Sequence, residues 1–424
     1  TDAVRQHLEG DFIARQILAD LSGLSMNSTT QQHTSKIVFG DDRKPQDKFV
    51  YTDLSEMFPG YKHGFNPDKK VVESVYRDEI TGEGGYVYAE PGLYYDVAVL
   101  DVASMHPTSI EQLNLFGEYT ENFSALKRAR IAIKRKRYDE AKKMLGGTLA
   151  RHLDDPSQAE ALSYALKIVI NIVYGLTAAR FDNSFKDPRN IDNIVAKRGA
   201  LFMIDLKHAV QELGFQVVHI KTDSIKVPGA TPELIQFIMD FQTKYGYEFE
   251  HEATYSKFCL VNDAVYIAQY GWADNPKKIG TWDATGAQFQ HPYVYKYLFS
   301  KEPITFNDKC ETKSVTSAMY IDYTGLDDTP MALATPVDGD NRRFVGKTGR
   351  FSPMQPGTGG GVLIREKDEK QFAVTGTKGY FWLESEMVQS LGREQDIDMT
   401  YFQGLVDNAI ETIKKFGEYE AFVS

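Results

Sequence analysis

Two aspartates, Asp101 and Asp223, stand where the sequence predicts the ends of β-strands. Residues 94–110 (YYDVAVLDVASMHPTSI) are apolar on both alternating faces up to Asp101, which is typical of a strand buried on both sides, and Pro107 ends the extended pattern. Asp223 lies at the tip of an apolar-flanked hairpin around residues 222–224. Carboxylates on a sheet core are costly unless neutralised, and a divalent cation neutralises them well. The pair predicts a phosphoryl-transfer centre, although a helix cap at Asp101 and a simple hairpin tip at Asp223 remain open alternatives.

Two helical segments separate the aspartates in the sequence. Residues 127–143 hold nine Lys or Arg residues against two acidic ones, a local net charge of +7 by subtraction. This segment is either a solvated helix face or a surface for phosphates. In residues 156–176, apolar side chains recur at helical spacing, and Lys167, Asn171 and Tyr174 share the other face at i, i+4 and i+7.

The composition narrows the class of protein. The chain has 424 residues, roughly three domains' worth, with 42% hydrophobic residues and a net charge of −11. Two cysteines, Cys259 and Cys310, exclude a disulfide framework and a cysteine-rich zinc site, and they fit a reducing compartment such as the cytoplasm. The sequence shows neither a secretory signal nor an apolar run of roughly 20 residues, so we expect no membrane partner. Because the sequence begins at Thr1, we expect a fragment or a processed product.

The elements that must position these residues mix helices and strands, which predicts the α+β class. Helices are expected over 2–21, 124–145, 156–176, 194–213, 232–245 and 400–416. Hairpins are expected over 86–102, 215–229 and 362–375. Residues 40–70 read as an extended connection, and 325–361 as a Gly-rich, Pro-rich and Asp-rich stretch without a period.

Three segments resemble the motifs of family B DNA polymerases, and they occur in the family's order. DVASMHPTSI (101–110) resembles motif A, KIVINIVYG (167–175) resembles motif B, and HIKTDS (219–224) resembles motif C. The resemblance covers about residues 85–270. It implies a right-hand architecture with an antiparallel-sheet palm, helical fingers and a divergent thumb. The implied N-terminal segment is 1–84 and the implied fingers are 123–165. The palm would comprise 85–122 and 166–290, and the thumb 291–424.

The resemblance also implies roles for single residues. Asp101, Asp223 and the Val102 carbonyl would hold two Mg²⁺ ions, with Mn²⁺ as a substitute, and Lys167 would join the aspartates as a catalytic residue. The incoming deoxynucleoside triphosphate would contact Ser104, Met105, His106, Arg130, Lys134, Lys167, Asn171 and Tyr174. Primer–template DNA would contact Gly175, Lys221, Thr222, Ser224 and Tyr266. The implied reaction is attack of a primer 3′-hydroxyl on the nucleotide's α-phosphate.

The chain departs from the family pattern at four positions. His106 replaces the motif A tyrosine that excludes a ribose 2′-hydroxyl, and Lys221 replaces the first aspartate of motif C. Ile172 replaces the motif B serine, and Ala264 replaces the lysine of a Lys-x-Tyr element that keeps Tyr266. These changes put sugar discrimination and the primer grip in question.

Only residues 7–11 resemble a motif of the family's 3′–5′ exonuclease, so we expect no proofreading by this chain. A separate exonuclease or processivity subunit is an expected partner. The compact size and divergent motifs suggest a virus-encoded, phage-like or mobile-element protein, which would act in the host cytoplasm. Two alternatives remain: a catalytically weak or inactive scaffold that binds primer–template, and a metal-dependent phosphodiesterase on another fold.

The C-terminal third carries two further candidate nucleic-acid contacts. Arg342, Arg343, Lys347 and Arg350 are predicted in a Gly-rich loop, and residues 378–382 interleave a lysine with aromatics. Core packing is the favoured reading of those aromatics.

Overall fold

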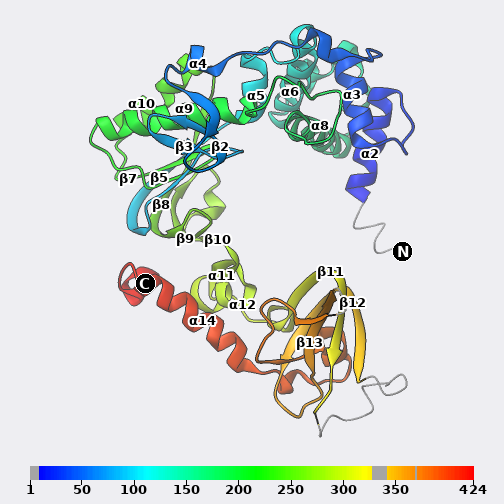
Figure 1. Ribbon diagram of the computed structural model, residues 1–424, viewed down its shortest axis with the longest axis vertical. Helices are drawn as coiled ribbons and strands as arrows, with labels where there is room; N and C mark the ends of the chain where they lie inside the picture. The colour runs from blue at the N-terminus through cyan, green and yellow to red at the C-terminus, as the bar shows by residue number, and fades with distance from the viewer. Residues whose placement is uncertain (1–8, 327–340, 368–369) are drawn as a thin grey trace. The chain divides into compact units, whose positions relative to one another are not determined.

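The computed structural model describes residues 9–326, 341–367 and 370–424, and in it the chain divides into two compact units. The first unit comprises residues up to 90 together with 97–253, and the second comprises 91–96 with 254–424. Each unit has its own hydrophobic core. The units mix helices with antiparallel sheet, which fits the α+β class (Figure 1). The subdomain boundaries implied by the polymerase resemblance remain predictions.

A seven-stranded sheet contains both aspartates. Its order is β10-β9-β8-β5-β7-β6-β4. The strands are β4 (Val87–Ala89), β5 (Gly92–Val102), β6 (His219–Lys221), β7 (Ser224–Pro228), β8 (Phe249–Asn262), β9 (Val265–Ala273) and β10 (Trp282–Thr285).

The pairing of β5 with β7 sets the register of this sheet. Leu100 lies opposite Ile225, and these side chains belong to the buried core of the first unit. Helices α9 (Ile194–Glu212) and α10 (Pro232–Phe241) cover this apolar face (Figure 1). The predicted hairpin around residues 222–224 is confirmed as β6–β7. The opposite face is therefore the one on which polar side chains can gather.

The hairpin predicted over 86–102 is wrong. Strand β4 pairs with β6 and not with β5, and the Glu90 amide continues the ladder by donating to the Val218 carbonyl at 2.8 Å. The apolar β5 pairs instead with the apolar β7, which leaves β4 to extend the sheet at the free edge of β6.

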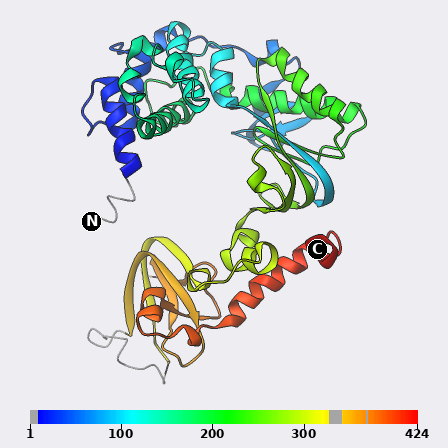
Figure 2. The same cartoon turned by 180° about the vertical axis from the view of Figure 1, so that it is seen from behind.

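A cluster of helices forms the other part of the first unit. Helices α2 (Glu9–Ser22) and α3 (Thr30–Phe39) pack against α6 (Thr120–Lys134) and α8 (Pro156–Thr177), as both ribbon views show (Figure 2). The predicted helix over 124–145 is too long. It ends at Lys134, because Lys136 adopts a left-handed backbone with φ of 57° within a run of four cations.

Helix α8 begins at Pro156, the first residue of the helix predicted over 156–176. Among the described residues, Gln158–Thr177 is the helical stretch long and apolar enough to cross a membrane. Its apolar residues Leu162, Leu166 and Val169 are instead fully buried in the core of the first unit. The apolarity of α8 is thus accounted for by packing.

Residues 40–70 are less extended than predicted. They include the short helix α4 (Leu54–Met57) and strand β1 (Lys62–Asn66). Strands β1, β2 (Val71–Tyr76) and β3 (Glu79–Thr81) form a small antiparallel sheet. Asn66 favours the β1–β2 turn by accepting from the Asp68 amide at 3.0 Å.

The second unit is built on a five-stranded antiparallel sheet of order β14-β13-β11-β12-β15. Its strands are β11 (Glu311–Asp322), β12 (Arg342–Met354), β13 (Val362–Lys367), β14 (Lys370–Ala373) and β15 (Phe381–Glu384). The predicted C-terminal hairpin is confirmed as β13–β14, and the predicted final helix as α14 (Met399–Lys414).

The prediction that residues 325–361 lack regular structure is wrong for β12, while residues 327–340 lie outside the described part of the chain. Two glycines, Gly346 and Gly349, and shifts in register against β11 hide the alternation of this strand. The four cations predicted in a loop therefore lie on a strand.

Candidate active site

Asp101 and Asp223 come from neighbouring strands of one sheet. Asp101 lies opposite Ser224 in the β5–β7 register, and the Val102 amide donates to the Asp223 carbonyl at 2.8 Å. Asp101 sits near the end of β5, and Asp223 occupies the turn between β6 and β7. The two aspartates, which are far apart in the sequence, therefore lie at the same end of the sheet.

Unusual backbone conformations flank both aspartates. Thr222, directly before Asp223, has φ of 58°, and Ser104, three residues after Asp101, has φ of 55°. Left-handed conformations in residues other than glycine are uncommon and often occur at functional turns. Gly85 allows the Thr222 turn to form, because a Cβ at position 85 would lie 2.7 Å from the Thr222 side chain and 2.9 Å from its Cα.

Lys226 is a buried cation beside the carboxylate pair. It lies on β7 opposite Val99, and therefore on the same sheet face as Asp101 and Ser224. Only 4% of the residue is exposed, and its Nζ lies 3.4 Å from the Ser224 Oγ. A lysine between Ile225 and Val227, in an otherwise apolar strand, was visible in the sequence, but Lys226 was not among the predicted site residues.

Burial raises the pKa of both aspartates. The pKa of Asp101 rises to about 8, first because of burial and then because of repulsion by Asp223 and Glu252, while Lys226 opposes the shift. Burial also raises the pKa of Asp223, again against the attraction of Lys226. The surroundings therefore do not fully stabilise the ionised form of the two carboxylates, and a bound cation would stabilise that form.

The donor set fits Mg²⁺. Within the described ranges, no group of three or more His, Cys, Asp or Glu side chains gathers at metal-binding distance. Asp101 and Asp223 would thus be the side-chain ligands, joined by a main-chain carbonyl such as that of Val102. Mg²⁺ is commonly held by one or two carboxylates, with water and substrate phosphates completing its shell. Two carboxylates and one carbonyl at the end of the sheet therefore match the kind of ligands that Mg²⁺ takes in proteins.

His106 and Tyr174 come together beside this site from the two segments predicted to bind nucleotide. Their rings stack with centroids 3.9 Å apart and an angle of 15° between the planes. Burial lowers the pKa of His106 to about 4, so the imidazole is neutral near pH 7. Its Nδ1 atom is buried and makes no hydrogen bond to any described residue.

The N-terminus of helix α5 (Met105–Gln112) lies between Asp101 and His106 in the chain. Ser104 caps it without a side-chain hydrogen bond, Pro107 has no amide hydrogen and the Thr108 amide donates to the Ser104 carbonyl, so the Met105 and His106 amides are the first-turn donors that an anion could use. The Met105 side chain is buried and packs against Gly199, where a Cβ would lie 2.5 Å from the Met105 Sδ. The predicted nucleotide contact of Met105 is therefore restricted to its backbone.

The other predicted nucleotide contacts lie on helices α6 and α8. Lys167 and Asn171 are exposed on α8, and Gly175, which was predicted to contact DNA, faces open space on the same helix. On α6, Lys134 is exposed at the last turn. Arg130 is half-buried, and its Nε has no hydrogen-bond partner among the described residues. Burial lowers the pKa of Arg130 without removing its charge.

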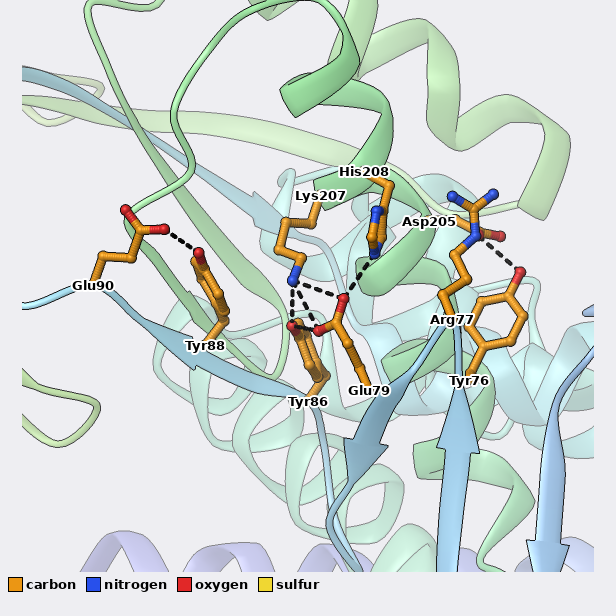
Figure 3. A network of polar contacts seen from close by, with 9 residues as sticks. All are labelled: Tyr76, Arg77, Glu79, Tyr86, Tyr88, Glu90, Asp205, Lys207 and His208. Atoms are coloured by element: carbon orange, nitrogen blue, oxygen red, sulfur yellow. Dashed lines mark hydrogen bonds and ion pairs between the residues drawn. The ribbon is translucent and has the colours of Figure 1, made fainter.

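A polar network holds the edge strand β4 and the small sheet against α9 (Figure 3). Lys207 donates to Glu79 at 2.8 Å and to the Tyr86 hydroxyl at 2.9 Å, and His208 lies 2.7 Å from Glu79. The Tyr86 carbonyl in turn accepts from the Thr222 amide at 2.9 Å. The network thus supports the turn that carries Asp223.

A second buried contact supports helix α5. The Arg198 guanidinium donates to the Tyr245 carbonyl at 2.6 Å and lies 4.7 Å from the Tyr247 ring centre. The Tyr247 hydroxyl lies 2.7 Å from the Ser109 Oγ. Without an alignment, nothing in the sequence distinguished Arg198 from other helix cations.

The predicted DNA contacts divide between the two units. Lys221 is exposed on β6 opposite Ser224, and Thr222 and Ser224 are partly exposed beside it. Tyr266 lies in the second unit, where its hydroxyl donates to Asp283 at 3.1 Å. The first three residues belong to the end of the sheet that carries the aspartates.

No family model matches this sequence, and no curated protein does. Among solved structures, the chain is similar to the family B DNA polymerase from the hyperthermophilic archaeon Pyrobaculum calidifontis, with a TM-score of 0.46 and 13% sequence identity. The match covers 99% of this chain and 55% of that chain, so the protein spans about half the length of that polymerase. A likeness at this level assigns no family, and the function is argued from the residues.

Proposed function

We propose that this protein is a template-directed DNA polymerase that adds deoxynucleotides to a primer 3′-hydroxyl and lacks proofreading in this chain. The observation that carries the proposal is the meeting of Asp101 and Asp223 at one end of one sheet. In the proposed architecture this sheet is the palm, the α6–α8 helices are the fingers, and the second unit contains a divergent thumb.

The chemistry assigned to the carboxylates is metal-assisted nucleotidyl transfer. Mg²⁺ held by Asp101, Asp223 and the Val102 carbonyl would lower the pKa of the primer hydroxyl and neutralise the leaving pyrophosphate. The attraction of Lys226 lowers the pKa of Asp101 and of Asp223 against the effect of burial, which favours ionised carboxylates ready to bind a cation.

The nucleotide is assigned to the surface between helix α5 and helix α8. Lys167 and Arg130 would pair with its phosphates, and the Met105 and His106 amides at the start of α5 would donate to the same anion. The stacked rings of His106 and Tyr174 would lie against its sugar and base. Positioning and charge are the main protein contributions to phosphoryl transfer, and these residues supply both.

Primer extension with Mg²⁺ and four deoxynucleotides tests the proposal. We expect extension by the intact chain and loss of about a thousandfold or more in Asp101→Asn and in Asp223→Asn, with primer–template affinity retained. The matched control is Asp240→Asn, which changes an exposed aspartate of α10. Equal activity in all three variants would refute the metal assignment.

The alternative function is a primer–template-binding scaffold without chemistry. The observation that favours it is the exposed Lys221 at the motif C position where the family has a carboxylate. Tight primer–template binding by the intact chain without extension in Mg²⁺ or Mn²⁺ would establish this alternative. Retention of Asp101, Asp223 and Lys167 supports the polymerase.

A further inference from the structure

A cross-strand aromatic pair with one exposed ring lies on the five-stranded sheet of the second unit. Tyr320 on β11 is directly opposite Phe344 on β12, with ring centroids 5.5 Å apart. The Arg342 guanidinium lies 5.5 Å from the Tyr320 ring centre. We call Tyr320, Phe344 and Arg342 the aromatic patch.

The aromatic patch is not part of the packed core of the second unit. Phe344 is 62% exposed, whereas Met319 and Ile321, the neighbours of Tyr320 along β11, are fully buried. Side chains alternate between the two faces of a strand, so the buried face already supplies the packing of β11. The exposed Phe344 ring, with the partly exposed Tyr320 ring opposite it, is therefore a candidate binding surface.

The strand that carries Phe344 is strongly basic in an acidic chain. Strand β12 contains four Lys or Arg residues and no Asp or Glu, against a net charge of −11 for the whole protein. Arg350 is exposed and lies an even number of residues from Phe344, as its partner Thr312 does from Tyr320, so side-chain alternation puts it on the face of the aromatic patch. Arg342 is less available, because it lies 3.9 Å from Glu366 and opposite Asp322.

We propose that this sheet face binds single-stranded DNA, with a base stacked on Phe344 and Tyr320 and a backbone phosphate further along the strand near Arg350. Aromatic rings bind bases through their flat faces, and nearby cations follow the sugar–phosphate backbone. In a duplex the flat faces of the bases are covered by their neighbours, so the patch favours an unpaired strand. This site lies wholly within the second unit and goes beyond the polymerase proposal.

Fluorescence anisotropy with a labelled oligothymidylate of about 16 nucleotides tests this site. The experiment uses the full chain carrying Asp101→Asn, so the outcome does not depend on polymerase activity. We expect Phe344→Ala to weaken binding about 5- to 100-fold and Phe344→Trp to restore it. Arg350→Ala should reduce the slope of log affinity against log salt by about one.

Phe372→Ala is the matched control. Phe372 is also exposed (45%) and has the Arg365 guanidinium 5.6 Å from its ring centre, but it lies on the edge strand β14. It should change affinity by less than about twofold. An equal loss in Phe344→Ala and Phe372→Ala, or tighter binding of a duplex of the same length, would overturn the proposal.

Photocrosslinking identifies the contact independently of affinity. An oligonucleotide with 5-iodouracil should crosslink to peptides that contain Tyr320 or Phe344, and Phe344→Ala should reduce the yield on β12. Crosslinks confined to the first unit would overturn the proposal even if the chain binds single strands. Circular dichroism of each variant shows whether an affinity change reflects lost folding.

Discussion

The His106 imidazole stacks on the Tyr174 phenol ring at a centroid distance of 3.9 Å. The two residues lie 68 positions apart by subtraction, on helices α5 and α8, and the contact joins the segments that resemble motifs A and B. Burial keeps the imidazole neutral, so it presents a flat, uncharged surface to a ligand. A neutral ring can limit the space beside a sugar without attracting its phosphates.

His106→Ala should increase ribonucleotide incorporation relative to deoxynucleotide incorporation by about tenfold, because it opens the space beside the ribose 2′ position. Single-nucleotide incorporation with matched ribo- and deoxyribonucleotides measures the ratio. Tyr174→Phe is the control, since it retains the aromatic ring that stacks on His106. An unchanged ratio in His106→Ala would show that His106 does not exclude the 2′-hydroxyl.

His106 should also make the free protein sensitive to acid. Its folded-state pKa of about 4 lies below the ordinary 6.5, so the unfolded chain binds a proton between these values and the folded chain does not. The resulting stabilisation is complete above pH 6.5 and is lost as the pH falls toward 4, by about 2 kcal/mol after allowance for partial exposure. Urea unfolding of wild type and His106→Phe from pH 7 to 4 measures it. Parallel pH profiles would contradict this prediction.

Lys226→Met should move the acid limb of the activity profile to higher pH by about one unit. Lys226 lowers the pKa of Asp101 and Asp223, so its removal leaves the pair harder to ionise. The profile of kcat/KM for primer extension between pH 6 and 9 measures the shift. Lys226→Arg keeps the charge and should retain the wild-type limb, whereas a uniform loss of activity at every pH would indicate a packing role.

Lys167→Ala should raise the KM for the nucleotide about tenfold or more, because an exposed lysine on α8 is assigned to its phosphates. Steady-state extension at saturating primer–template measures KM and kcat separately. Arg137→Ala is the control, since Arg137 is an exposed cation of the basic segment 127–143 and pairs with Glu140 at 2.6 Å. An effect of Lys167→Ala confined to DNA affinity would contradict the assignment.

Local patterns in the sequence predicted much of the first unit. The apolar run before Asp101, the hairpin around Asp223 and the helix after Asp155 each follow from turn and capping chemistry within a few residues. The pairing of β4 with β6 was missed, because partner choice depends on which edges remain free after β5 has paired with β7. Lys226 was missed because a strand pattern does not reveal that a lysine will be enclosed. Strand β12 was missed because glycines and register shifts interrupt its alternation.

The close approach of Gly85 to Thr222 has a consequence for variation of this protein. A single methyl group at position 85 would meet the backbone of the turn that holds Asp223. Random libraries should therefore recover almost no tolerated substitution at this position, although it carries no reactive atom. Position 85 should therefore be held fixed in any library that varies the turn around Asp223.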